Sequence, residues 1–159
     1  MLAGQFALTT AAIFTGAAIY VSLCEQPARL QLDDRALLIE WKPSYKHGFA
    51  MQAPLALIGA ALGFAAWWQV GDWRWLVGAV VIISAWPYTL VVIKPTNDEL
   101  LAIDPANAGQ RSRTLIEKWG WLHAGRTAVG VITQFYSYGL RCAPERAPRC
   151  RAAYIALVR

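Results

Sequence analysis

The sequence predicts an all-α integral membrane protein, a bundle of four transmembrane helices, from its composition and from four long apolar windows. Of its 159 residues, 57% are hydrophobic and 16% are charged, whereas an average soluble domain has about 45 to 50% and about 25%. Crossing a bilayer takes about 20 apolar residues at about 1.5 Å each. Four windows meet this requirement, at residues 4–23, 48–68, 75–93 and 121–140. Barrel strands would alternate apolar and polar residues, so continuous runs favour helices.

The first three windows have clear boundaries. No Lys or Arg precedes residues 4–23, and the first basic residue is Arg29, so we expect a retained helix rather than a cleaved signal peptide. The short connection 69–74 is flanked by tryptophans, which favour membrane interfaces, and it therefore predicts an antiparallel hairpin. Pro87 should kink the third helix, with Thr89 helping to satisfy the freed backbone.

We assign residues 1–140 to one membrane domain and residues 141–159 to an arginine-rich tail. A short amphipathic helical segment is predicted between the third and fourth crossings, because Thr96 begins a helix-capping pattern. The side with the two long connections carries eight basic residues and the opposite side six. This small excess weakly favours a cytoplasmic location for the long connections. We expect a multi-pass protein of the plasma or inner membrane. Cys142 and Cys150 would pair only if the tail faced an oxidising compartment.

The charge balance has an explanation other than nucleic acid. A net charge of +5 and a pI near 9.4 would suggest nucleic-acid binding in a soluble protein. Here the excess basic residues flank apolar spans, where they orient membrane proteins. A nucleic-acid partner is therefore not expected.

Polar side chains gather where the first, third and fourth helices meet the long connections. In the fourth helix, offsets of four and three residues place Trp119, His123 and Arg126 on one face. A buried arginine needs a carboxylate or a polar cavity, and Glu25, after the first window, is the expected ion-pair partner. Such a pair could serve only to pin two helices, but its location beside Asn97 favours a site. The predicted lining of this site comprises Asn97, Trp119, Trp86, Tyr45, Thr89 and Lys94.

A metal site is a minor alternative. The side chains of His123, His47 and Glu25 would satisfy a two-histidine, one-carboxylate set by count. No HxxxH or ExxH spacing supports that set. No metal is therefore assigned.

Three motifs carry a family resemblance: EQPA after the first window, WPYTLVVIKPTNDELL through the third and WGWLHAGRT at the start of the fourth. Over most of residues 1–140 the chain resembles the anthrone oxygenase-like family of small four-helix membrane proteins. The resemblance implies oxidation of anthrones, which are flat tricyclic phenolic ketones, to anthraquinones with dioxygen and without an organic cofactor. The positions that match the family pattern are Glu25, Pro95, Asn97, Trp119, His123 and Arg126.

The chemistry that this resemblance implies is base-assisted. Removal of the acidic methylene proton of an anthrone gives an electron-rich enolate that can react with dioxygen. His123 is the expected base, and Arg126 is the expected partner of the enolate oxygen. The remaining roles are a hydrogen-bond donor at Asn97, charge balance from Glu25 and a stacking face from Trp119 or Trp86.

A noncatalytic membrane protein is the alternative. It would bind a lipid, a quinone or a partner subunit through the same pocket. A transporter is less favoured because the four helices carry no inverted repeat. The expected partners are the lipid bilayer and a lipophilic aromatic small molecule. Assembly into a homo-oligomer is an open alternative.

Overall fold

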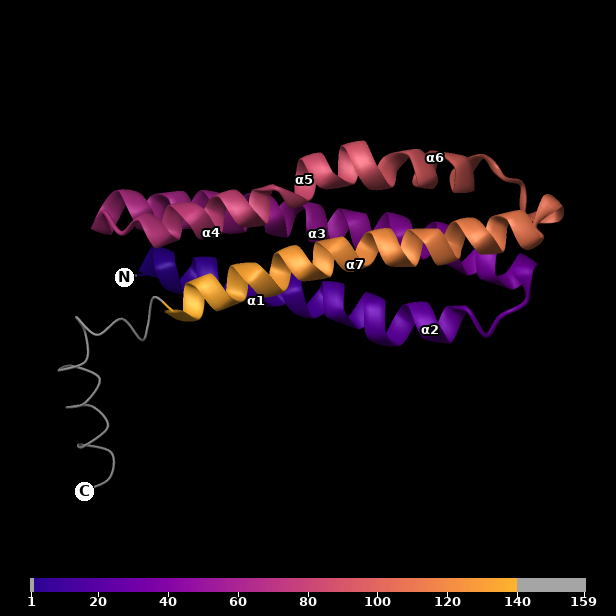
Figure 1. Ribbon diagram of the computed structural model, residues 1–159, viewed down its shortest axis with the longest axis horizontal. Coiled ribbons are helices and arrows are strands. Elements are labelled where there is room, and N and C mark those ends of the chain that lie inside the picture. The colour runs from indigo at the N-terminus through magenta and orange to yellow at the C-terminus, as the bar shows by residue number, and fades with distance from the viewer. Residues whose placement is uncertain (1, 140–159) are drawn as a thin grey trace, which may run out of the picture.

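The computed structural model describes residues 2–139, which form four long helical rods lying side by side (Figure 1). The first rod joins α1 (Leu2–Tyr20), the π-helical turn η1 (Val21–Glu25) and α2 (Gln26–Arg29). The second is α3 (Asp34–Val70). The third joins α4 (Trp73–Ile83), α5 (Ala85–Tyr88), the π-helical turn η2 (Thr89–Ile93) and α6 (Lys94–Ala102). After the short η3 (Pro105–Asn107), the fourth rod is α7 (Gln110–Gly139). The predicted all-α bundle is confirmed.

The rods form a ring in which α1 and α4 each pack against both α3 and α7. The predicted hairpin between the second and third windows is present and turns at Gly71, whose φ of 69° is the left-handed conformation that glycine adopts without strain. Asp72 then caps α4 by accepting a hydrogen bond from the backbone of Arg74. The turn therefore holds α3 and α4 antiparallel.

Within residues 2–139, three helical stretches are long and apolar enough to cross a membrane, namely Leu2–Arg29, Asp34–Val70 and Trp73–Ala102. They cover three of the four predicted crossings. The fourth window corresponds to α7, which is long enough at 30 residues. Within the described part, its apolar run is interrupted by His123, Arg126 and Gln134. These polar residues lower its mean hydropathy, so α7 is not among the three stretches above.

The two long connections are mostly helical, which differs from the predicted boundaries. The second rod begins at Asp34 rather than near residue 48, and α7 begins at Gln110 rather than near residue 121. The Asp33 side chain caps α3, and its hydrogen bond from the backbone of Ala36 holds the pKa of this carboxyl below its ordinary value. An apolar window marks only the part of a helix that suits lipid. The helix itself extends beyond the window where its side chains pack against other helices.

The helical segment predicted between the third and fourth crossings is present, but it is not a separate surface helix. Its first part, α6, continues directly from η2, and its last part is the start of α7. Thr96 lies buried inside α6 and caps nothing. The reason is packing, since Leu100 of α6 and Ile116 of α7 meet Leu37, Leu38 and Trp41 of α3 in one core.

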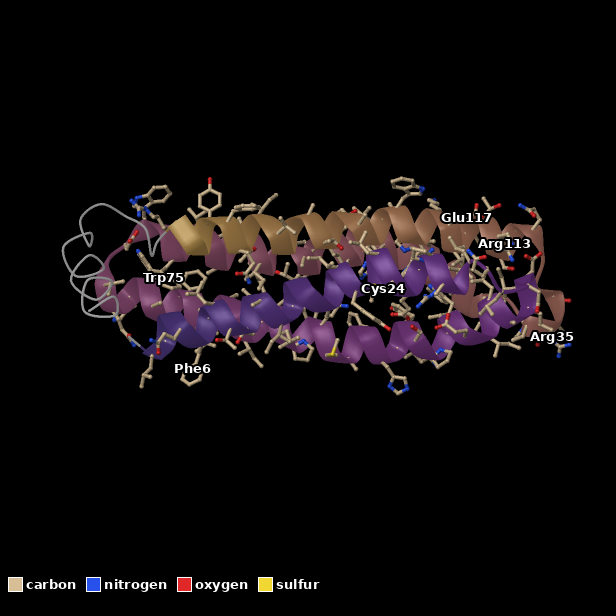
Figure 2. The ribbon with its side chains drawn as sticks, turned by 90° about the horizontal axis from the view of Figure 1, so that it is seen from below. Phe6, Cys24, Arg35, Trp75, Arg113 and Glu117 are labelled. Atoms are coloured by element: carbon tan, nitrogen blue, oxygen red, sulfur yellow. The ribbon has the colours of Figure 1, made fainter. Side chains whose placement is uncertain are left out.

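Two apolar cores divide the bundle along its length. Small residues dominate the core near the hairpin turn, where Ala11, Ala56, Ala60 and Ala85 surround Phe14 and Ile82. Larger side chains fill the core at the connection end. Figure 2 shows the labelled Phe6 and Trp75 near one end of the rods and the charged Arg35, Arg113 and Glu117 toward the other. The three labelled charged side chains therefore lie toward the end of the bundle that carries the long connections.

Candidate functional site

A cavity of about 450 Å³, which includes its open mouth, lies among the four rods. All four rods contribute side chains to its lining. The predicted site residues that line it are Glu25, Tyr45, Thr89, Asn97, Trp119, His123 and Arg126. The expected meeting of the first, third and fourth helices is therefore present, and the second helix joins them.

Two π-helical turns shape the cavity wall. Val21 and Glu25, the ends of η1, line the cavity, and so do Thr89 and Ile93, the ends of η2. A π turn inserts an extra residue into a helix and redirects the side chains around it. Each of these turns ends two residues before a proline, Pro27 or Pro95, which lacks the N–H that would continue the α-helical bonding. This spacing is a sequence signal for both turns.

Trp119, His123 and Arg126 share one face of α7, as the offsets predict. The rings of Trp119 and His123 stack, with centroids 5.0 Å apart and planes 28° apart. His123 Nδ1 lies 3.3 Å from the hydroxyl oxygen of Ser22 on η1. All three side chains of the α7 face are buried. The imidazole is therefore held in a fixed orientation at the cavity wall.

Arg126 is 6% exposed, and its guanidinium lies over the Phe14 ring, with 5.6 Å between its Cζ and the ring centroid. Its Nε has no hydrogen-bond partner. No carboxylate in residues 2–139 lies within ion-pair distance of it. A buried cation with this environment is costly unless an anion comes to it.

The expected ion pair between Glu25 and Arg126 is wrong. Glu25 instead accepts hydrogen bonds from Arg29 and from Ser44. Arg29 follows Glu25 by four residues on one helical rod, the spacing that brings side chains together on one face. The charge of the Glu25 carboxylate is therefore balanced by Arg29 of the same rod, and Glu25 forms no ion pair with α7.

Arg29 is a second buried cation at the cavity, and the sequence reasoning missed it. Its guanidinium also contacts Glu40, at 3.2 Å from Nε to Oε2, and donates to Ser44 at 2.8 Å. Its Cζ lies 5.6 Å from the centroid of the Trp119 ring. Four partners thus surround this arginine, whose charge the protein itself balances.

Amide side chains supply further polar groups. Asn97 is buried, and neither its side-chain oxygen nor its nitrogen has a hydrogen-bond partner. Gln52, which the sequence reasoning missed, is also buried at the cavity with an unpartnered Oε1. Thr89 already donates to the backbone oxygen of Ala85, so its proton is engaged within its own rod. Beside Arg126, these two amides therefore remain free to hydrogen-bond a ligand.

Two predicted residues lie outside this cavity. Lys94 is exposed and forms an ion pair with Asp98 at 2.5 Å, so its assignment to the lining is wrong. Trp86 lines a neighbouring apolar cavity of about 240 Å³, to which Arg126 also contributes, and its indole N–H donates to Ala53. Lys94 directly follows η2, whose extra residue shifts the register of the side chains after it.

The metal alternative gains no support from the geometry. His47 is exposed and does not line the cavity with His123 and Glu25. Over the described part of the chain, no group of three His, Cys, Asp or Glu side chains is placed to hold a metal ion. Cys24 is exposed as a free thiol. Cys142 and Cys150, for which pairing was conditional on an oxidising compartment, lie outside the described residues.

These features define an α-helical bundle with helices of membrane-spanning length and a buried, cationic pocket. The anthrone oxygenase family matches residues 41–134, more than half of the sequence, and the chain belongs to that family. It is similar to the noranthrone monooxygenase of Aspergillus flavus, with 31% identity over 134 residues that cover 76% of this chain and 64% of that protein. The chain therefore spans somewhat less than two thirds of that relative.

A second relative gives a consistent result. The chain is 27% identical to an anthrone oxygenase of Cryptosporiopsis sp. over 128 residues, which cover 76% of this chain and 75% of that protein. No solved structure matches the chain. The family assignment therefore comes from sequence comparison and does not depend on the geometry of the site.

Proposed function

We propose that the protein is a membrane-embedded oxygenase that converts an anthrone-like substrate to a quinone with dioxygen and without an organic cofactor. The observation that carries the proposal is the buried Arg126 guanidinium, which has no carboxylate partner among residues 2–139 and lies on the same helix face as the buried His123. Two relatives named for oxygenation of an anthrone or noranthrone support the substrate class.

The reaction begins with proton transfer. The His123 imidazole takes a proton from the methylene carbon of the anthrone, and the electron pair moves onto the carbonyl oxygen to form an enolate. Arg126 stabilises the new negative charge, and Asn97 donates a hydrogen bond to it. Both interactions strengthen as charge develops, which is the condition for lowering a barrier rather than only binding substrate.

Dioxygen then oxidises the bound enolate. One electron passes from the enolate to dioxygen, and the two radicals combine to form a C–O bond, giving a peroxide that takes a proton back from His123. Loss of water breaks the O–O bond and removes the second methylene hydrogen, which leaves a carbonyl. One oxygen atom enters the product, the other leaves as water, and the substrate supplies every electron.

The rest of the site suits a flat, apolar substrate. Trp119 in this cavity and Trp86 in the neighbouring one provide aromatic surface, and Arg126 contributes to both cavities. We place α7 as the fourth crossing, with its polar face turned into the bundle. The protein is then multi-pass in a plasma or inner membrane. A lipophilic substrate would reach the pocket from the bilayer.

Isotope labelling tests the reaction. Purified protein in detergent is supplied with anthrone and ¹⁸O-labelled dioxygen, while oxygen uptake and quinone absorbance are followed. We expect one dioxygen consumed per quinone, one labelled oxygen in the new carbonyl and no hydrogen peroxide. Quinone formation no faster than in buffer alone, with anthrone still bound, would instead favour the noncatalytic binding protein.

Matched histidine variants complete the test. His123→Ala should lose turnover, by about 10² to 10⁴ if the imidazole is the base. His47→Ala, which changes an exposed histidine of α3, should keep wild-type turnover. Equal rates for both variants would remove His123 from the mechanism.

A further inference from the structure

We propose that Ser22 and Thr127 fix the tautomer of His123, holding the proton on Nδ1 and leaving Nε2 as the base. The proposal rests on the proposed catalytic role of His123. Neither hydroxyl lines the cavity, so both would be positioning residues that act through the imidazole. Ser22 belongs to the π-helical turn η1 and Thr127 to α7.

Three contacts form a chain from the imidazole to the backbone. His123 Nδ1 lies 3.3 Å from Ser22 Oγ, and Ser22 Oγ lies 2.9 Å from Thr127 Oγ1. Thr127 Oγ1 donates to the backbone oxygen of Ala18 at 3.1 Å. Every group in this chain has a defined capacity to donate or accept, so the direction of each bond can be assigned.

The carbonyl at the end of the chain sets that direction. The oxygen of Ala18 can only accept, so the single hydroxyl proton of Thr127 points to it. Ser22 must then donate its own proton to Thr127, which leaves its oxygen as an acceptor for His123. Nδ1 therefore carries the hydrogen. The reverse order would place two acceptor oxygens, those of Thr127 and Ala18, against each other without a proton.

The fixed tautomer has a chemical consequence. In a neutral imidazole with hydrogen on Nδ1, the lone pair that can take a proton is on Nε2. When Nε2 accepts the substrate proton, the N–H of Nδ1 keeps its bond to Ser22, so the ring need not turn during the reaction. Stacking on Trp119 holds the ring plane as well. The relay thus prepares the base before substrate arrives.

Nitrogen NMR tests the tautomer without any assay of activity. The chain has two histidines, so ¹⁵N-histidine labelling in a His47→Gln background leaves the signals of one ring. We expect the protonated-nitrogen signal to belong to Nδ1 and the unprotonated one to Nε2. A protonated Nε2 in this neutral ring would overturn the proposal, whether or not the protein oxidises anthrones.

Two variants locate the cause of the tautomer. Ser22→Ala removes the acceptor for Nδ1, and Thr127→Val removes the hydroxyl that orients Ser22 while nearly keeping the volume. Either change should shift signal intensity from the Nδ1–H form to the Nε2–H form. An unchanged spectrum in both variants would mean that the hydroxyl chain does not hold the proton.

Kinetics separate positioning from structural damage. Thr127→Val should lower kcat about tenfold or more, with KM changed less than twofold, if the relay prepares the base rather than binds substrate. Thr127→Ser restores the hydroxyl and should recover the rate. Thr133→Val is the control, because Thr133 is a buried threonine of α7 whose hydroxyl donates only to Val129 of its own helix. A matching loss of kcat in this control would contradict the relay.

Discussion

The two buried arginines of the cavity differ in one respect. Arg29 and Arg126 are 3% and 6% exposed, and each guanidinium carbon lies 5.6 Å from the centroid of an aromatic ring. Arg29 has Glu25, Glu40 and Ser44 as partners. Arg126 has no carboxylate within ion-pair distance in the described chain. The same residue type therefore occupies opposite electrostatic situations in one cavity.

This difference predicts a structural role for Arg29 and, under the proposed function, an anion-binding role for Arg126. Removing one member of a buried ion pair leaves the other charge without compensation, which costs folding stability. Removing a buried cation that has no counter-ion takes away a desolvation cost and should cost little stability. The free energy invested in burying Arg126 is recovered only when an anion binds, and the enolate oxygen of the proposed substrate is such an anion.

Loss of Arg29 should have the largest effect. Arg29→Met leaves Glu25 and Glu40 unpaired, and breaking a buried pair costs about 3 to 5 kcal/mol, with the lower end expected because Glu40 is partly exposed. Thermal unfolding in detergent measures the loss. The double variant Arg29→Met, Glu25→Gln should recover part of it. A stability equal to wild type would mean that this cluster does not hold the rods together.

Loss of Arg126 should separate activity from stability. Arg126→Met should unfold at the wild-type temperature or above, because it removes an uncompensated charge. Its kcat for anthrone oxidation should fall about 10²- to 10³-fold, the cost of losing one oxyanion donor. Rate and unfolding temperature are measured on one preparation. A sharp drop in unfolding temperature would place Arg126 with Arg29 as a structural cation.

A glycine pair tests whether packing around α7 holds the site in register. A Cβ at Gly125 would lie 2.3 Å from the Tyr88 hydroxyl, which donates to the oxygen of Leu122 at 2.8 Å. Gly125→Ala should therefore cost about 1 to 3 kcal/mol. Gly16→Ala is the control, since no atom lies within 4 Å of its added Cβ. Equal unfolding temperatures for the two variants would contradict the close approach.

The smallest effect is expected at Asn97. Asn97→Leu removes two buried polar atoms without protein partners, so unfolding temperature should stay equal or rise. If Asn97 hydrogen-bonds the substrate, kcat/KM should fall by up to about tenfold, the value of about 0.5 to 1.5 kcal/mol for one hydrogen bond. Steady-state kinetics measure it. Unchanged kcat/KM would leave the enolate to Arg126 alone.

The sequence predicts which helices contribute side chains to the cavity better than it predicts which of those side chains form ion pairs. Offsets along α7 place Trp119, His123 and Arg126 correctly, because they depend only on helical geometry. The predicted partner of Glu25, Arg126, lies on another helix, whereas the observed partner, Arg29, lies four residues away on the same rod. An apolar window also hides the face on which a residue lies, so Gln52 could not be assigned to the cavity from sequence.

The helix extensions and π turns show a second limit. Hydropathy marks the part of a rod that suits lipid, but the rods continue because Leu37, Leu100 and Ile116 bury one another outside those windows. The prolines after η1 and η2 do carry a local signal, through their missing N–H groups. What that signal lacks is the direction in which the widened turn points its side chains, which depends on the neighbouring rods.

An anaerobic titration tests the central claim most directly, because it isolates enolate formation from the reaction with oxygen. Wild-type protein is titrated with anthrone under argon, at a pH where free anthrone is neutral, and the absorbance of the enolate is followed. We expect the enolate absorbance to saturate with wild-type protein, to be absent with Arg126→Met and to persist with His47→Ala. Enolate of equal intensity in the Arg126→Met protein would contradict the claim.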